Sequence, residues 1–165
     1  MRDIINHIKE ETQSTGSNIY WSVENNTIGE SALLVINDFG EENIPGMFVS
    51  EPIRKGHIRK FRKGFNTTHR TKISACARLK SMVEKGKLKI HSKPFITELK
   101  AFVASGSSYK AKTGETDDLV SSMLLAMRII TVLKDWDPKV YTSFSHADED
   151  TADRVYPLPL FISSS

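Results

Sequence analysis

The sequence has a single cysteine, Cys76, among 165 residues. One cysteine cannot form an internal disulfide, which excludes a disulfide-stapled secreted fold and favours a reducing compartment. No basic start followed by an apolar signal core occurs at the N-terminus. The longest apolar-rich stretch, residues 119–133, contains Arg128 and several Ser and Thr, so it is too short and too polar to span a bilayer. From these shortages we expect neither a secreted protein nor a membrane protein.

The remaining composition is typical of a globular domain, at 39% hydrophobic and 26% charged residues. A chain of this length can bury one sizeable core but not two full domains. Beyond residue 135 the sequence holds three prolines, an acidic patch and a final run of serines. We therefore expect one domain over residues 1–134 and a tail or docking segment over residues 135–165.

Charge is strongly segregated, although the net charge is only +3. Residues 52–83 contain ten Lys or Arg and no Asp or Glu, which leaves thirteen basic and twenty acidic residues elsewhere. Such a basic block attracts polyanions, of which phosphate backbones are the commonest. A solvated surface loop is the alternative explanation of the same charges.

Hydrophobic patterning predicts alternating helices and strands. Helices are expected around the opening isoleucines and over residues 27–39, 68–85, 92–103 and 117–134. Strands are expected over residues 19–23, 47–49, 88–90 and 107–112. Residues 51–66 are interpreted as a mobile loop or a hairpin. This alternation predicts an α/β sheet with functional residues at the carboxyl ends of strands or the starts of facing helices.

Local signals place the helix ends. Thr27, with Glu30 three residues on, has the spacing of a capping box, and Thr116 is the expected cap of the last helix. Gly16, Gly40 and Gly86 are expected stop signals. The apolar faces are expected to consist of Ile4, Ile5 and Ile8 in the opening helix; Ala32, Leu33, Val35 and Ile36 in the next; Ile73, Ala77, Leu79 and Val83 in the third; Phe95, Leu99, Phe102 and Val103 in the fourth; and Val120, Met123, Leu124, Met127, Ile130 and Leu133 in the last.

Acidic residues occupy two of the expected functional places. Glu24 follows a predicted strand, and Asp117 and Asp118 open the last helix. Phosphodiester cleavage by two metal ions needs several carboxylates that converge on the cations. Each acid also has a structural explanation, because acidic first turns complement the helix dipole and a glutamate at a strand end can form a salt bridge or a cap.

Four segments together resemble the nuclease domain of tailed-phage terminase large subunits. They are residues 20–29 (YWSVENNTIG), 70–72 (RTK), 79–91 (LKSMVEKGKLKIH) and 116–120 (TDDLV), in matching order and spacing. The resemblance covers roughly residues 1–134 and implies a ribonuclease-H-like mixed sheet flanked by helices. It also implies cutting of concatemeric viral double-stranded DNA during packaging, by an acidic triad with Mg²⁺ or Mn²⁺ in a two-metal site.

The resemblance assigns roles residue by residue. Glu24 corresponds to the second acid, and the third lies in the Asp117–Asp118 pair. Asp118 is favoured as the metal ligand with Glu24, because it matches the second Asp of the motif and shares a helix side with the small residues Ser122 and Ala126. Asp117 is a helper or takes its place. The residues expected to bind DNA phosphates are Arg54, Lys55, Arg59, Lys60, Arg62, Lys63, Arg70 and Lys72.

The chain departs from the family pattern in three ways. Thr116 stands where the family often has His. The first catalytic Asp is expected on a strand well before the Glu motif, whereas Asp3 falls in a predicted helix. A G-x-x-x-x-G-K-[ST] phosphate loop, the mark of the ATPase motor, is also missing. We therefore expect a C-terminal portion that lacks the first strands and one metal ligand and can be inactive alone.

The resemblance implies double-stranded DNA as a partner, with the portal, the small terminase subunit and the ATPase part as further partners in the cytoplasm of an infected bacterium. Two alternative functions are an inactive DNA-binding or assembly module of the packaging motor and a resolvase-like junction nuclease. His57, His69 and His91 have no zinc-site spacing. Cys76 and Trp21 are expected in the core, and Trp136 is a candidate contact between tail and domain.

Overall fold

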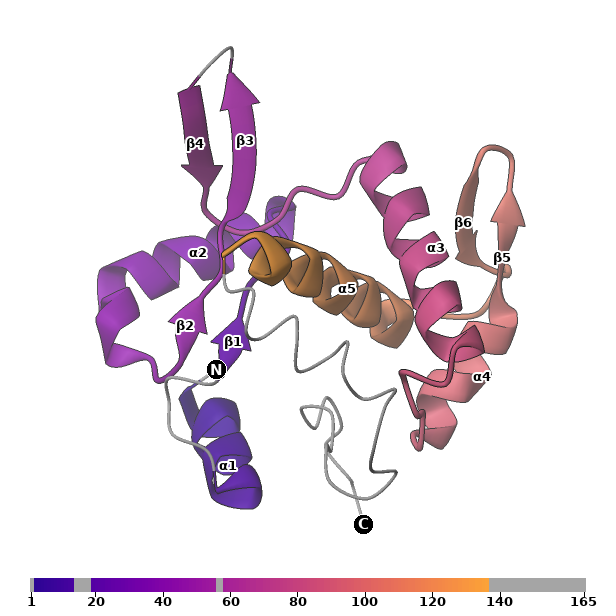
Figure 1. The fold of residues 1–165 in the computed structure, drawn as a ribbon, viewed down its shortest axis with the longest axis horizontal. Helices are drawn as coiled ribbons and strands as arrows, with labels where there is room; N and C mark the ends of the chain where they lie inside the picture. Colours follow the sequence, from indigo (N-terminus) through magenta and orange to yellow (C-terminus); the bar gives the residue numbers. More distant parts are fainter. Residues whose placement is uncertain (1, 14–18, 56–57, 137–165) are drawn as a thin grey trace. The chain divides into compact units, whose positions relative to one another are not determined.

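The computed structural model describes residues 2–13, 19–55 and 58–136 (Figure 1). Internal contacts divide the chain between Thr67 and Thr68 into an N-terminal unit and a C-terminal unit. Helices alternate with short paired strands in a mixed α/β architecture, which confirms the expected fold class. None of the described helices is both long and apolar enough to cross a membrane.

The N-terminal unit contains two helices, a parallel strand pair and a hairpin. Its elements are α1 (Arg2–Thr12), β1 (Tyr20–Trp21), α2 (Thr27–Phe39), the 3-10 turn η2 (Glu41–Asn43), β2 (Met47–Phe48), β3 (Glu51–Lys55) and β4 (Ile58–Arg62). β1 pairs in parallel with β2, and β3 pairs antiparallel with β4. The hairpin alternative for residues 51–66 is therefore confirmed, and Figure 1 shows β3 and β4 extending away from the β1–β2 pair.

A small apolar cluster holds the N-terminal unit together. Its buried members are Ile5, Ile19, Trp21, Ile36 and Ile44. The Trp21 ring meets the Phe48 ring edge-on at a centroid distance of 4.8 Å, so the prediction that Trp21 is a core residue is confirmed. The predicted face of α2 is partly wrong, because Ile36 is buried whereas Val35 is 67% exposed.

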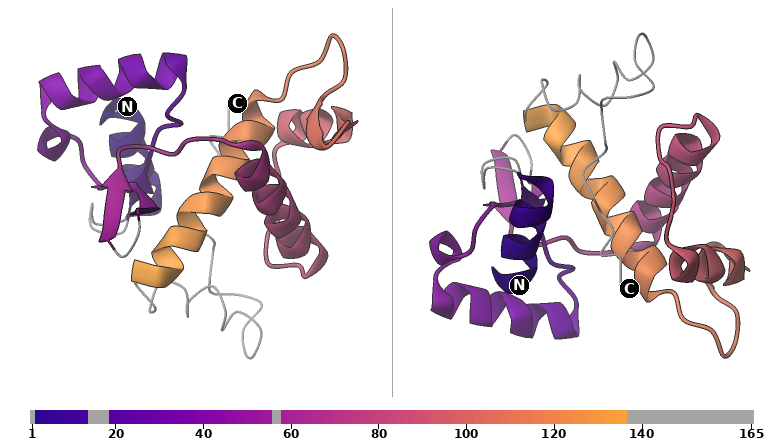
Figure 2. Two further views of the ribbon diagram at one scale, coloured as in Figure 1. Left: turned by 90° about the horizontal axis from the view of Figure 1, so that it is seen from above. Right: turned by 90° about the horizontal axis from the view of Figure 1, so that it is seen from below.

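The C-terminal unit is three helices and a second hairpin. Its elements are α3 (His69–Glu84), α4 (Lys93–Ala101), β5 (Phe102–Ser105), β6 (Ser108–Ala111) and α5 (Asp118–Trp136). β5 and β6 pair antiparallel. Both views in Figure 2 show α3 and α4 on the same side of α5.

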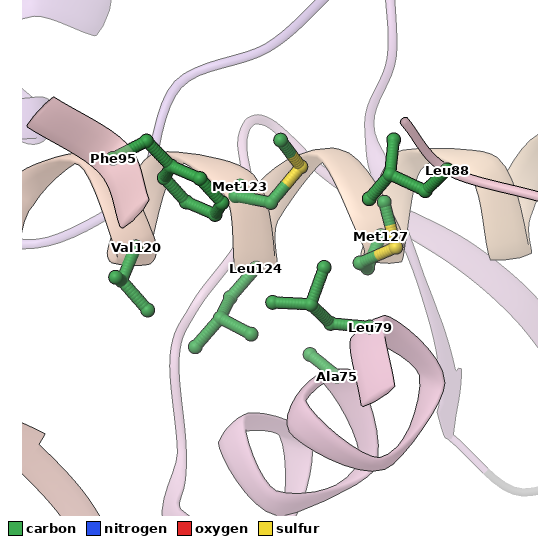
Figure 3. Close-up of a cluster of buried hydrophobic side chains, with 8 residues drawn as sticks. All are labelled: Ala75, Leu79, Leu88, Phe95, Val120, Met123, Leu124 and Met127. Atoms are coloured by element: carbon green, nitrogen blue, oxygen red, sulfur yellow. The ribbon is translucent and has the colours of Figure 1, made fainter. Parts of the chain in front are cut away.

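The core of this unit lies along one face of α5 (Figure 3). Val120, Met123, Leu124 and Met127 are buried there against Leu79 of α3, Phe95 of α4, Ala75 and Leu88. The periodic face predicted for the last helix is confirmed, with Ile130 partly buried and Leu133 buried. In α3 the buried residues are Ala75 and Leu79, while Ala77 and Val83 are exposed, so half of the face predicted for that helix is wrong.

Two predicted elements have different structures. Residues 88–90 form no strand; instead the N–H groups of Lys87 and Leu88 donate to the Met82 carbonyl at 2.9 and 3.2 Å, and Leu88 packs into the core as part of a connector. Phe102 and Val103 do not continue α4, because they pair with Ala111 and Lys110 as the start of β5. The tail expected from residue 135 starts later, because Asp135 and Trp136 still belong to α5. Residues 137–165 and the predicted stop at Gly16 lie outside the described residues.

Candidate functional site

Glu24 lies at the end of the extended segment that follows β1. Phe65 donates its N–H to the Val23 carbonyl at 2.9 Å, and Asn25 donates its N–H to the Phe65 carbonyl at 2.7 Å. Glu24 consequently forms a parallel bridge with Phe65. The glutamate is partly buried and sits just before α2, as its position after an apolar strand predicted.

Asn26 links the start of α2 to the Glu24 carboxylate. Its Oδ1 accepts a hydrogen bond from the Gly29 N–H at 2.8 Å, which caps the helix. Its Nδ2 donates to Glu24 Oε2 at 3.2 Å. The cap predicted at Thr27 is therefore wrong by one residue, because Asn26 caps the helix and the Glu30 N–H, which a capping box at Thr27 would have bound, donates to the Asn26 carbonyl at 2.7 Å. One side chain thus caps the helix and orients the acid.

Gly29 allows α2 to start directly against the backbone of Glu24. A Cβ built on Gly29 would lie 1.6 Å from the Glu24 carbonyl oxygen. No side chain fits in this space, since real Cβ atoms do not approach backbone atoms so closely. The Glu-x-Asn-x-x-Gly pattern is therefore a local structure in which Asn26 and Gly29 both fix the position of Glu24.

Asp117 and Asp118 have different surroundings at the start of α5. Asp118 is the first residue of the helix and is exposed, and its carboxylate has no hydrogen-bond or ion-pair partner within the described residues. Asp117 Oδ2 lies 3.8 Å from Lys72 Nζ, with side chains 29% and 21% exposed. Lys72 Nζ also lies 5.3 Å from the centre of the Phe102 ring. Asp117 is thus paired, while Asp118 is available to a ligand.

The first backbone N–H groups of α5 bind to a carboxylate on another helix. Glu98 Oε2 accepts from the N–H groups of Leu119 and Val120 at 2.8 and 3.3 Å, and Glu98 Oε1 accepts from Thr116 Oγ1 at 3.0 Å. The predicted cap, Thr116, is therefore wrong, because its hydroxyl donates to Glu98. Sequence patterns gave no signal for Glu98, since caps are recognised from local spacing and Glu98 lies on α4.

Comparison with protein families decides the identity. A family model described as the terminase RNaseH-like domain matches residues 4–128. The chain belongs to this family. The match contains Glu24, Asp117, Asp118 and the whole basic block, and it confirms the family resemblance. The terminase RNaseH-like domain is a packaging-nuclease family, which agrees with the coarse function expected from the sequence.

The acidic residues of this terminase domain fall in separate units. Glu24 belongs to the N-terminal unit, and Asp117 and Asp118 belong to the C-terminal unit. Over residues 2–13, 19–55 and 58–136, no three His, Cys, Asp or Glu side chains gather where they could hold a metal ion. Asp3, which was expected in a helix, lies in α1.

The donor chemistry fits the divalent metal that RNaseH-like nucleases typically use. Glu24 Oε1 and the Asp118 carboxylate have no protein partner within the described part of the chain. Both supply hard, anionic oxygens, the ligands that Mg²⁺ and Mn²⁺ prefer. Mg²⁺ favours octahedral coordination, so each of these carboxylates would need further oxygen ligands to complete its shell.

The predicted DNA contacts lie mostly on the first hairpin. Arg54 and Arg59 are backbone partners in the β3–β4 register, as are Ile53 and Lys60, while Lys55 pairs with Ile58. Arg62 and Arg70 are exposed. Lys63 is also exposed but lies 3.1 Å from Glu41, and Lys72 is paired with Asp117. The side chains of residues 54–60 lie outside the described part of the structure.

The remaining candidates have structural partners or lie outside the described chain. His69 Nε2 contacts the Ser107 carbonyl oxygen, and His91 is exposed, whereas His57 is not described. Cys76 is partly buried against the core of the C-terminal unit, as predicted. Burial raises the pKa of its thiol, and the nearby charge of Lys72 acts in the opposite direction. The thiol is therefore a poor nucleophile at neutral pH.

Proposed function

We propose that this terminase RNaseH-like domain is a metal-dependent endonuclease that cuts concatemeric viral double-stranded DNA during genome packaging. The observation that carries the proposal is the state of its carboxylates. Glu24 is held by Asn26 through one oxygen and keeps the other available, and Asp118 is exposed without a partner in the described chain. Carboxylates held in this way suit a cation better than carboxylates that are consumed by salt bridges.

Glu24 and Asp118 are the proposed metal ligands, because both match acidic positions of the family motif. Mg²⁺ or Mn²⁺ held by these carboxylates would activate water and stabilise the leaving oxygen of the phosphodiester. Asp117 acts as a helper that remains paired with Lys72. The third carboxylate comes from the segment that carries the first acid of the family, supplied by the rest of the terminase.

The basic block would bind the DNA backbone without reading its sequence. Arg54, Lys55, Arg59 and Lys60 are on the hairpin strands, and Arg62, Lys63 and Arg70 are exposed. Contacts of this kind neutralise phosphates and release counterions, so they give affinity that falls with salt. The proposed setting is the cytoplasm of an infected bacterium, with the ATPase part, the small terminase subunit and the portal as partners.

One observation favours a second candidate, an inactive DNA-binding or assembly module. Asp3, the one Asp that precedes Glu24 in the sequence, lies in α1 and not on a strand, where the family resemblance expects the first acid. A domain that kept the fold but not the complete ligand set would bind DNA and not cut it.

Plasmid cleavage with Mn²⁺ or Mg²⁺ tests the proposal. Wild type, Glu24→Gln and Asp118→Asn are compared, alone and with the upstream terminase segment added. Each substitution should lower cleavage by more than about 100-fold, because loss of even an outer partner of a metal ligand costs about 10–100-fold. Glu84→Gln, an exposed carboxylate at the end of α3, is the matched control and should cleave like wild type.

The outcomes separate the two candidates. Wild-type rates in Glu24→Gln or Asp118→Asn would refute the assignment of that residue. DNA binding without cleavage under every condition, including the added segment, would replace the nuclease by the inactive module.

A further inference from the structure

We propose that Glu98 is a positioning residue that fixes the first turn of α5 and thereby holds Asp118 in place for its metal; this inference rests on the function proposed above. Glu98 accepts hydrogen bonds from both sides of the acidic pair. Thr116 precedes the pair, and Leu119 and Val120 follow it. The two aspartates lie on a turn whose flanking groups are bound to a single carboxylate.

These hydrogen bonds differ from an ordinary helix cap in the location of the acceptor. The first N–H groups of a helix have no partner inside the helix and are usually satisfied by a side chain just before it. Here the acceptor belongs to α4, so the first turn of α5 is tied to a neighbouring helix. The partial positive charge at the helix start also stabilises the carboxylate of Glu98.

Packing holds α4 and the first turn of α5 rigidly together. Val120, which donates to Glu98, is 0% exposed, and Phe95 on the same helix as Glu98 is 3% exposed. Both belong to one buried cluster (Figure 3). Because donor and acceptor stand on elements that pack closely, the hydrogen bonds transmit the position of α4 to Asp118.

Lys72 holds the first aspartate of the pair. It binds Asp117 and lies over the ring of Phe102, the residue that follows α4. Asp117 is thus held by a cation, and Glu98 holds the backbone of the same turn. Asp118 is left as the carboxylate that the turn presents without a protein partner.

The test compares Glu98→Ala with Glu98→Gln. The glutamine amide oxygen can still accept from Leu119 and Val120, and its NH₂ can donate to Thr116 Oγ1. Glu98→Gln therefore keeps the hydrogen bonds to the first turn of α5 without the charge. Glu115→Ala removes an exposed carboxylate just before the same turn and is the matched control. Hydrogen exchange of the Leu119 and Val120 amides reports the tie, and Mn²⁺-induced broadening of amide signals around Asp118 reports metal binding without any need for cleavage.

We expect Glu98→Ala to speed exchange at both amides by roughly 3- to 30-fold, the range that corresponds to loss of a helix cap. We also expect it to raise the Mn²⁺ concentration needed for broadening and for cleavage, while Glu98→Gln and Glu115→Ala stay near wild type.

Unchanged metal midpoints in a folded Glu98→Ala variant would overturn the inference. The inference would also be overturned if Glu98→Gln kept wild-type amide exchange but bound Mn²⁺ as weakly as Glu98→Ala. Metal binding would then depend on the charge of Glu98 and not on the position of the turn. If wild type binds Mn²⁺ and never cleaves, the proposed function fails while the broadening experiment still decides the role of Glu98.

Discussion

Val49 and Phe65 bind to the same edge of the segment that carries Glu24, although residues 50–64 separate them in the sequence. Val49 donates its N–H to the Trp21 carbonyl at 2.8 Å, and Phe65 donates its N–H to the Val23 carbonyl at 2.9 Å. Carbonyls two residues apart on an extended segment point to the same side. The chain therefore leaves this edge after Val49 and returns to it at Phe65. The β3–β4 hairpin is an insertion between these two points.

This topology predicts that the hairpin can be shortened without unfolding the N-terminal unit. Replacing residues 52–61 by Asn-Gly would join Glu51 directly to Arg62, its partner in the register, through a two-residue turn. We expect the thermal midpoint to stay within a few degrees of wild type. DNA affinity should fall and its salt dependence should flatten, because four basic residues are lost.

A charge-only variant separates the hairpin from its charges. Arg54, Lys55, Arg59 and Lys60 are changed together to Gln with the hairpin left intact, and binding to linear duplex DNA is measured at several salt concentrations. Wild-type affinity at low salt in this variant would contradict a role for the hairpin charges in binding DNA.

Asn26 allows helix capping to be separated from orientation of the acid. Asn26→Ser keeps a good cap for α2, whereas Asn26→Ala loses it at a cost of about 1 kcal/mol. Both variants lose the hydrogen bond to Glu24 Oε2. If Asn26 orients the acid for metal, both should cleave about 10- to 100-fold more slowly, although Asn26→Ser unfolds close to wild type. Chemical denaturation and plasmid cleavage measure the two effects, and wild-type cleavage by Asn26→Ser would limit Asn26 to capping.

Gly29 should tolerate no side chain. An alanine Cβ would overlap the Glu24 carbonyl oxygen, so Gly29→Ala must displace either α2 or the segment that carries Glu24. We expect a loss of about 2–4 kcal/mol in the free energy of unfolding, despite the better helix propensity of alanine. Ser31→Ala, an exposed change on the same helix, should instead stabilise slightly. A Gly29→Ala variant as stable as wild type would contradict the close approach.

Sequence patterns predicted the elements more reliably than their ends. The face of α5 repeats with helical period over many residues, so Met123, Leu124 and Met127 were identified correctly. Leu88 and Ile90 also alternate with a polar residue, but here the alternation comes from a connector that packs on the core rather than from a strand. Phe102 continues the apolar spacing of α4, yet pairing with Ala111 draws it into β5. Short patterns are decided by tertiary partners that lie elsewhere in the sequence.

The candidate site divides in the same way. Glu24 and the aspartate pair were accessible to sequence reasoning, because a strand end and a helix start are local features. Asn26 and Gly29 belong to the segment that resembles the family, but their roles depend on contacts with Glu24 that spacing alone does not indicate. Glu98 had no local signal at all, since its partners are the backbone N–H groups of another helix.

Cys76 provides a probe of the charges around Asp117. Burial raises the pKa of its thiol, and the positive charge of Lys72 lowers it. Because the thiolate is the reactive form, alkylation by iodoacetamide should follow a pH curve displaced to higher pH than that of a free thiol. Lys72→Met should displace the curve further upward, since it removes the cation and also leaves the Asp117 carboxylate without its ion pair. Arg70→Gln, an exposed change two residues earlier on α3, is the matched control and should leave the curve in place. An unchanged curve or a downward displacement in Lys72→Met would mean that Lys72 does not act on Cys76 as a cation.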